Sequence, residues 1–280
     1  MAKLSIRGVS RRYSGTDGDV HALDNVSLEI ENGEFVVLIG PSGCGKSTLL
    51  NLIAGLDPPD SGEIWEDEKK ITGPGRDRSV VFQDGALFPW LTVQKNVEFG
   101  LKQMGLSPIE RKRRADYYLK LVHLSQFVDS SIHELSGGMR QRVAIARALA
   151  LEPDALLMDE PFAALDAQTR EDLYRVLHEI CGRTHTTIVF VTHNVREAVC
   201  LGDRVVLLSS RPGRIHAEYP IQLARPRFVD DADVASMARR ISDVLKEGLD
   251  ASRREEYDAD WVPAEAGVLR AVDGMLGDNI

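Results

Sequence analysis

A stretch of nine residues places the strongest constraint on how this chain folds. Residues 40–48 read GPSGCGKST and fit the pattern Gly-x4-Gly-Lys-Ser. An unbroken apolar run over residues 35–39 precedes them, and a helix-like stretch over residues 49–54 follows. In a loop between a strand and a helix, glycines allow successive backbone N–H groups to turn inward and surround an anion. We therefore predict that residues 40–48, called the phosphate loop below, bind a nucleoside triphosphate.

The phosphate loop also predicts roles for individual side chains. Lys46 is placed to reach the β- and γ-phosphates, and the Ser47 hydroxyl is placed to ligate Mg²⁺. Cys44 lies at a helix N-terminus, so we expect a lowered thiol pKa and expect alkylation of this thiol to block ATP binding. The predicted nucleotide-binding residues of the loop are Gly40, Pro41, Ser42, Gly43, Cys44, Gly45, Lys46, Ser47 and Thr48.

The composition excludes several classes of protein. The chain has 280 residues, of which 43 % are hydrophobic and 28 % charged, as expected for a globular protein with one large domain or one domain and an appendage. Its net charge of −9 argues against a general nucleic-acid-binding surface. Its three cysteines form no C-x-x-C pair, which fits a reducing cytosol better than a zinc site or a disulfide framework. No apolar run approaches the roughly 18 residues of a membrane span, so we expect any membrane role to come through a partner.

Apolar strands alternating with helices indicate an α/β fold with a mostly parallel, covered sheet. The predicted buried strands are residues 35–39, 79–82, 155–158, 187–191 and 205–208. Alternating patterns predict half-exposed strands near residues 4–8 and 26–30, a turn over residues 13–18 and an edge strand at residues 63–65.

Two segments depart from this alternation. Residues from 91 to about 150 have a helical pattern, which predicts a helical subdomain inserted in the α/β domain. Prolines mark a boundary near residue 220, so we divide the chain into a domain of residues 1–220 and an extension of residues 221–280. The extension contains one amphipathic helix near residues 234–249, which we expect to pack on the domain or on a second subunit, or simply to cover surface.

A second chemical element is an acidic pair at the end of a predicted strand. Residues 156–158 are apolar and lead directly into Asp159 and Glu160. Ligands of open α/β sheets bind at this carboxyl end of the strands. We expect Asp159 to support Mg²⁺ and Glu160 to polarise the attacking water, since catalysis of phosphoryl transfer is mainly positioning and electrostatic stabilisation. The alternative is that both acids only cap the following helix.

A third element, residues 135–142 with the sequence LSGGMRQR, is called the signature loop below. Its Ser-Gly-Gly at a helix start is a second potential phosphate-binding N-terminus. With this loop, the chain resembles the ATP-binding subunits of ABC transporters. The resemblance implies a RecA-like P-loop NTPase fold with an antiparallel β part. It also implies that Ser136, Gly137 and Gly138 close on the ATP held by a second subunit, in a head-to-tail dimer.

The same resemblance assigns further residues. Tyr13 matches the aromatic residue that stacks on adenine, although a simple packing role is the alternative. Gln83 matches the glutamine that contacts Mg²⁺ or the water and senses the transporter subunit. Residues 164–166 resemble the segment that couples the two ATP sites, and His193 matches the histidine that contacts the γ-phosphate. Glu160 and His193 are both present, so the resemblance implies competent hydrolysis.

Finer similarity points to the importers of nitrate, sulfonates and taurine. It is carried by residues 73–78, 81–83, 87–93, 159–166 and 210–215. It implies an ATPase that drives uptake of a small solute, works at the cytoplasmic face of the membrane, and has integral-membrane permease subunits and, indirectly, an external solute-binding protein as partners. Phe88 and Trp90 are then expected to form an exposed surface for the permease, or else to be satellite core packing. The alternatives for the whole chain are an ABC ATPase that acts on nucleic acid or ribosomes and one that handles lipid.

Overall fold

The structure is a computed structural model that describes residues 3–15, 18–184 and 186–260. Its helices are α1 (Lys46–Ala54), α2 (Val93–Gln103), α3 (Pro108–Leu121), α4 (Gly137–Leu149), α5 (Ala167–Thr184), α6 (Val195–Leu201) and α7 (Ala232–Asp260), with short 3-10 turns η1 (Ser125–Phe127) and η2 (Ile132–Glu134). Its strands are β1 (Leu4–Gly15), β2 (Gly18–Ile30), β3 (Phe35–Ile39), β4 (Ser61–Glu66), β5 (Lys69–Lys70), β6 (Arg78–Val81), β7 (Ala155–Asp159), β8 (Thr187–Val191), β9 (Arg204–Leu208) and β10 (Ile215–Pro220).

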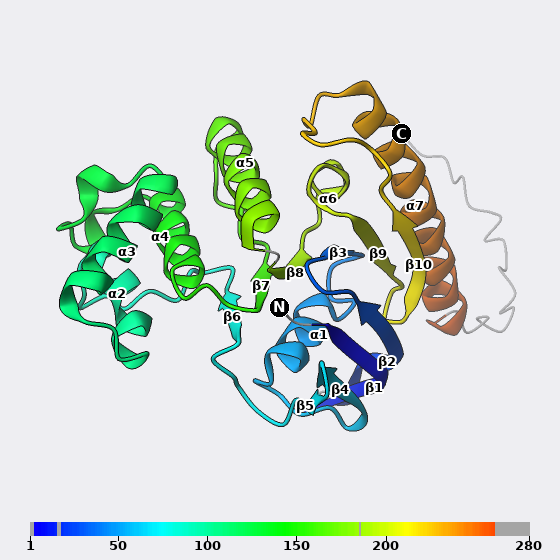
Figure 1. The fold of residues 1–280 in the computed structure, drawn as a ribbon. Coiled ribbons are helices and arrows are strands. Elements are labelled where there is room, and N and C mark those ends of the chain that lie inside the picture. The colour runs from blue at the N-terminus through cyan, green and yellow to red at the C-terminus, as the bar shows by residue number, and fades with distance from the viewer. Residues whose placement is uncertain (1–2, 16–17, 185, 261–280) are drawn as a thin grey trace, which may run out of the picture.

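The strands form one mostly parallel and one antiparallel sheet (Figure 1). The first has the order β10-β9-β3-β8-β7-β6, and only β10 runs antiparallel to its neighbour. The second has the order β2-β1-β4-β5. Helix α1 lies between them, since its Leu49, Leu50 and Ile53 are buried in one hydrophobic cluster with residues of both sheets. This arrangement confirms the predicted α/β fold with an antiparallel β part.

The parallel sheet gathers the chemically interesting residues at one edge. Strand β3 is buried along its whole length because β8 and β9 flank it and helices cover it, which explains its unbroken apolar sequence. The phosphate loop follows β3, Asp159 ends β7, and His193 comes two residues after β8. Register places these three ends side by side, because Leu38 and Asp159 both pair with Val191. The carboxyl edge of the sheet is therefore where a ligand is expected to bind.

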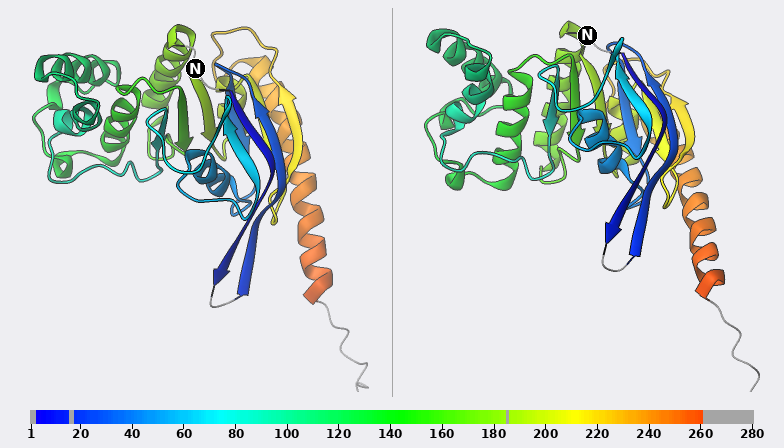
Figure 2. Two further views of the ribbon diagram at one scale, coloured as in Figure 1. Left: turned by 60° about the horizontal axis from the view of Figure 1, so that its bottom comes forward. Right: turned by 90° about the horizontal axis from the view of Figure 1, so that it is seen from below.

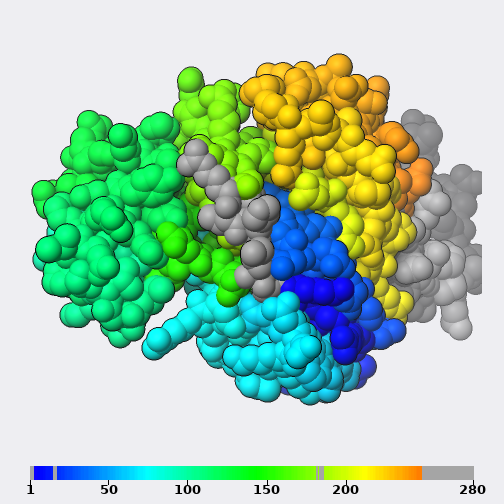
Figure 3. All heavy atoms as spheres, viewed as in Figure 1, coloured from blue at the N-terminus to red at the C-terminus, as the bar shows by residue number. Residues whose placement is uncertain are grey.

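Helices α2, α3 and α4 pack together as a lobe beyond β6, at one end of the molecule (Figures 1 and 3). Ser107 and Glu110 form a reciprocal capping box that starts α3, and the Thr92 side chain caps α2. One face of α3 is buried, with Ala115 and Leu119 both fully covered. The helical pattern from residue 91 is thus confirmed as real helices.

Three local expectations are wrong. Tyr13 lies within β1 and pairs with Val20 of β2, so the predicted turn is shorter and the hairpin longer than expected; Figure 2 shows its end projecting beyond the sheet. Strand β4 lies between β1 and β5 and is not an edge strand. Strand β10 was not predicted, although its apolar residues alternate with polar ones along half-buried positions.

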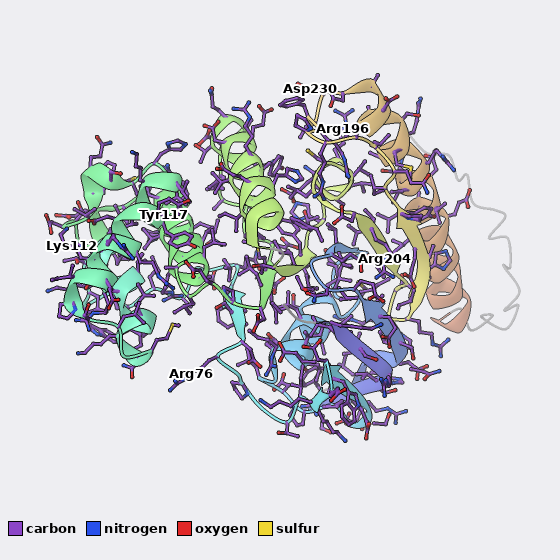
Figure 4. The ribbon with its side chains drawn as sticks, viewed as in Figure 1. Arg76, Lys112, Tyr117, Arg196, Arg204 and Asp230 are labelled. Carbon is purple, nitrogen blue, oxygen red and sulfur yellow. The ribbon has the colours of Figure 1, made fainter. Side chains whose placement is uncertain are left out.

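Arg204, labelled in Figure 4, links β9 to β10 and to the start of β3, because its guanidinium binds Glu218 and, at 2.8 and 2.9 Å, Glu34.

The segment after residue 220 packs on the main body. The buried Arg227 donates to the carbonyls of Val199 and Gly202 at the end of α6, both at 2.7 Å. In α7, Val234 and Ile241 are buried in the same hydrophobic cluster as α6. The predicted helix near residues 234–249 is therefore real and extends to Asp260, while the remainder of the predicted extension, residues 261–280, lies outside the described residues. The division of the chain at residue 220 stays a prediction.

Candidate active site

The phosphate loop bends around a position that only glycine fits. Gly45 precedes the first residue of α1 and has a φ of +94°, in the left-handed region. A Cβ atom there would lie 2.7 Å from the carbonyl oxygen of Ala22 and from the side chain of Leu23. The loop therefore approaches β2 closely, and its N–H groups lead into the positive end of α1.

Lys46 is buried within the loop, with 7 % of its surface exposed. Its ammonium group donates to the carbonyl oxygens of Gly40 at 3.0 Å and Pro41 at 2.8 Å. These bonds fix the side chain against its own loop, so the charge stands where the loop would surround a phosphate. The structure therefore places the Lys46 ammonium group within the loop that the sequence predicts to bind phosphate.

A cavity of about 370 Å³ adjoins the loop. Its wall includes Tyr13 of β1, Glu160, Arg211 and the loop residues Ser42, Gly43, Gly45, Lys46, Ser47 and Thr48. The Tyr13 ring is 36 % exposed, the Arg11 guanidinium lies 4.8 Å from its centroid, and its hydroxyl donates to Asp57 at 3.2 Å. The structure thus brings the predicted adenine-stacking residue to the same cavity as the phosphate loop.

Asp159 and Ser47 meet beside this cavity. Burial raises the pKa of the Asp159 carboxyl, while a hydrogen bond with the Ser47 side chain and the charge of Lys46 oppose that rise. A carboxylate and a hydroxyl are hard oxygen donors, and they fit Mg²⁺ held jointly by protein, water and phosphate. Among the residues that the structure describes, no cluster of three or more His, Cys, Asp or Glu side chains could hold a metal alone. The site fits an ion that arrives with a nucleotide.

Glu160 stands in a constrained conformation next to His193. Its φ is +44°, which is unfavourable for a residue with a side chain and recurs at functional sites. Its N–H donates to Val191 at 3.0 Å, and its carboxylate lies 3.1 Å from the Nδ1 atom of His193. The carboxylate is 23 % exposed and the imidazole 68 %, so both reach solvent at the carboxyl edge of the sheet.

A buried network that the sequence analysis missed supports this histidine. Glu197 of α6 is 5 % exposed and accepts hydrogen bonds from Tyr174, at 2.8 Å, and from Thr192. The Thr192 hydroxyl also accepts a hydrogen bond from the N–H of Asn194. Residues 192 and 194, on either side of His193, are thus linked to each other. Burial raises the pKa of the Glu197 carboxyl, and the two hydroxyl donors oppose that rise. An acid four residues after His193, directly before the four apolar residues 198–201, was the available signal.

We expect the Tyr174→Phe variant to be less stable by about 1–3 kcal/mol, because it leaves a buried carboxylate oxygen without its donor. Urea unfolding followed by circular dichroism measures the change. Tyr117→Phe is the matched control, since the Tyr117 side chain is 48 % exposed. Equal stability of the two variants would contradict the structural role of the Tyr174 hydroxyl.

Gln83 and the signature loop do not line the cavity, and neither do Gly40, Pro41, Cys44, Asp159 and His193. Gln83 is exposed two residues after β6, at the same edge of the sheet. The Ser136 hydroxyl accepts from the N–H of Met139 at 3.2 Å and so caps α4, and Gly138 lies against Ala164 and Leu165. The structure therefore joins the signature loop to residues 164–166 but leaves it apart from the phosphate loop of its own chain.

The expectation for Cys44 is wrong. The Cys44 side chain is 1 % exposed, and this burial raises the pKa of its thiol although Lys46 opposes the rise. The effect of the helix N-terminus on the thiol pKa is outweighed because the thiol points into the packed interior of the loop.

We expect iodoacetamide to label Cys44 far more slowly in the folded protein than in urea at pH 7.5, as measured by mass spectrometry of the labelled peptide. Rapid labelling without denaturant would contradict the burial of this thiol.

Arg211 is a further residue of the cavity that the sequence analysis did not single out. It lies in the loop between β9 and β10 and donates from Nε to the Gly43 carbonyl at 2.9 Å. The sequence of residues 210–215 predicts only a family similarity, because nothing in it indicates that this loop folds back on the phosphate loop.

Comparison with known proteins agrees with this geometry. A model of the ABC transporter family matches residues 23–163. The nitrate import ATP-binding protein NrtD of Synechocystis sp. is 54 % identical over 220 residues, covering 79 % of this chain and 83 % of NrtD. The taurine import ATP-binding protein TauB of Burkholderia pseudomallei is 50 % identical over 237 residues, covering 85 % and 91 %.

Solved structures give the same result. A dimeric bacterial ABC transporter cassette superposes with a TM-score of 0.74 and 37 % sequence identity, covering 79 % of this chain and 100 % of that one. The post-hydrolysis dimer of that cassette, bound to ADP and Pi, superposes with a TM-score of 0.72 and 36 % identity over the same shares.

Proposed function

The chain belongs to the ABC transporter family, and we propose from this premise that it is the ATP-hydrolysing subunit of an importer. The observation that carries the proposal is the convergence of the phosphate loop, Glu160 and Tyr13 on one cavity. The solved relative with ADP and Pi is a cassette dimer after hydrolysis, which supports ATP turnover between two such subunits.

In the proposed mechanism, the phosphate loop and Lys46 hold the triphosphate, and Tyr13 receives the adenine. Ser47 and Asp159 would hold Mg²⁺, which would neutralise charge on the phosphates, and Gln83 would complete this site from β6. Glu160 orients and polarises the attacking water, while His193, whose Nδ1 atom lies 3.1 Å from the Glu160 carboxylate, contacts the γ-phosphate. These assignments require little rearrangement, because the phosphate loop, Gln83, Asp159 and His193 end or follow parallel strands at the carboxyl edge of one sheet, and Tyr13 reaches the same cavity from β1.

We assign Ser136, Gly137 and Gly138 to the ATP of a second copy of the chain. The signature loop is exposed at Ser136 and Gly137 and does not line the cavity of its own chain. The N-terminus of α4 remains free to meet a phosphate from outside. Two copies arranged head to tail would each complete the other's site, and hydrolysis would release the closed pair.

A surface near β6 suits the membrane partner. Trp90 is 76 % exposed, whereas Phe88 is half-buried and stacks on Trp90 and Phe99, with centroid distances of 5.6 and 4.4 Å, so only part of the expected exposed pair is exposed. A mainly apolar hollow of about 400 Å³, bordered by Phe82, Phe88 and Phe99, adjoins it. No helix among the described residues is long and apolar enough to cross a bilayer. We propose that permease subunits dock here and that the protein works at the cytoplasmic face of the membrane.

The solute is proposed to be a small anion or zwitterion of the nitrate, sulfonate or taurine type, since the relatives named above import nitrate and taurine. No described residue of the nucleotide cavity has a part in choosing it. The choice would fall to the permease and to an external solute-binding protein.

Purification of tagged protein from detergent-solubilised membranes tests the transport function. We expect a multi-span permease pair to co-purify, and expect Trp90→Ala to weaken its recovery. Ile109→Ala is the matched control, because Ile109 is 83 % exposed on α3, outside the residues that border the hollow. Recovery of soluble partners or nucleic acid alone would leave the ATPase chemistry standing and overturn the importer function.

A further inference from the structure

Arg211 is held at the nucleotide cavity by a hydrogen bond to Gly43. Its Nε atom donates to the Gly43 carbonyl at 2.9 Å. Gly43 has a φ of +76°, and a Cβ atom there would lie 2.6 Å from the Nη2 atom of Arg211. The absence of a side chain at residue 43 therefore makes room for the guanidinium directly over the phosphate loop.

The charge of Arg211 is not compensated by any acid in the part of the chain that the structure describes. Its neighbours along the chain differ in this respect. Arg204 pairs with Glu34, Arg214 with Asp24, and Arg225 with Asp203. Arg211 shares its cavity with Lys46, and Glu160 is the acidic residue among those that line it, so the lining contributes two cations and one acid.

We propose that Arg211 is a phosphate-binding residue of the nucleotide site, an inference that rests on the proposed ATP-binding function. Its Nε atom is committed to the loop carbonyl, which orients the guanidinium plane and leaves its terminal N–H groups to the cavity. A planar guanidinium donates two parallel hydrogen bonds to phosphate oxygens, a geometry that an ammonium group lacks. Arg211 thus complements Lys46, whose ammonium is shared with the carbonyls of Gly40 and Pro41.

The experiment measures equilibrium dissociation constants for ATP, ADP and adenosine by calorimetry or by competition with a fluorescent nucleotide. All proteins are full-length and carry Glu160→Gln, which prevents turnover during the measurement. We expect Arg211→Ala to weaken ATP and ADP about tenfold and to leave adenosine unchanged, because only the nucleotides offer phosphates. Arg211→Lys should recover part of the loss, and the salt dependence of ATP binding should become shallower in Arg211→Ala.

Arg214→Ala is the matched control. It removes the same charge three residues away, but Arg214 pairs with Asp24 and does not line the cavity. We expect it to bind ATP like the parent protein. If Arg211→Ala unfolds, Arg211→Gln decides, because its amide can still donate to Gly43 without carrying charge.

Two other outcomes overturn the inference and are distinguishable. A purely structural role for Arg211 would weaken ATP and adenosine by the same factor, so an unchanged ratio of the two affinities refutes phosphate binding. Failure of the parent protein to bind ATP at all would instead overturn the proposed function, and the inference with it.

Discussion

Replacing Glu160 with Gln is expected to lower ATP turnover by a factor of about 100 or more while leaving ATP binding intact. The amide keeps the size and the hydrogen-bonding reach of the carboxylate but cannot accept a proton from water. The constrained backbone at Glu160, with its φ of +44°, and the 3.1 Å contact with His193 remain available to the amide. The loss should therefore fall on the chemical step.

Phosphate release measures the loss of ATP turnover, and size-exclusion chromatography shows whether the variant forms a dimer with ATP. With ATP the variant should accumulate as a nucleotide-filled dimer, because the step that opens the pair is blocked. Glu31→Gln is the control, since Glu31 lies in the exposed turn between β2 and β3 and its removal should change neither quantity. A monomer that hydrolyses ATP at the normal rate with Glu160→Gln would contradict both the base and the dimeric site.

The second large effect is expected from mixing two inactive variants. Lys46→Ala removes the buried cation of the phosphate loop, and Gly137→Glu places an acid at the N-terminus of α4. The structure favours Gly137 for this purpose because a Cβ atom there meets only the tip of Arg140, at 3.9 Å, so the variant should fold. Each variant alone is expected to lose hydrolysis, the first through lost binding and the second through repulsion of the partner's phosphates.

In a mixture of equal amounts, half of the random dimers contain one chain of each kind. Such a dimer has one site built from an intact phosphate loop and an intact signature loop, so about a quarter of all sites should be restored. Single-turnover phosphate release measures this recovery. Gly182→Glu, on α5 with nothing within 4 Å of a Cβ atom, controls for the added charge. A mixture as inactive as its components would contradict the exchange of signature loops between subunits.

The parts of the site that the sequence predicts are those encoded locally. Residues 40–48 form a loop whose backbone geometry is determined by the spacing of its glycines, and Asp159 and Glu160 stand at the end of a strand whose burial makes it continuously apolar. The position of His193 follows from the same rule, since its strand β8 is buried at every residue. Parallel pairing then brings these ends together.

The remaining parts depend on contacts between segments distant in the sequence. Arg211 reaches the phosphate loop because β10 folds back on β9, and nothing in its own segment indicates that contact. The network around Glu197 requires Tyr174 from another helix. The prediction of a lowered thiol pKa for Cys44 was wrong for the same reason. Burial by tertiary packing raises this pKa more than the helix N-terminus lowers it.

The contact between Arg227 and α6 has a consequence for how this protein could be shortened or fused. Arg227 satisfies the last carbonyls of α6, and Val234 and Ile241 fill the hydrophobic cluster against that helix. Residues on both sides of the prolines near residue 220 are therefore packed together. Cutting the chain there would expose α6 to solvent. A reporter or a fusion partner attached after α7 would leave α6 buried. We therefore expect any shortened form of the protein to need the first turns of α7.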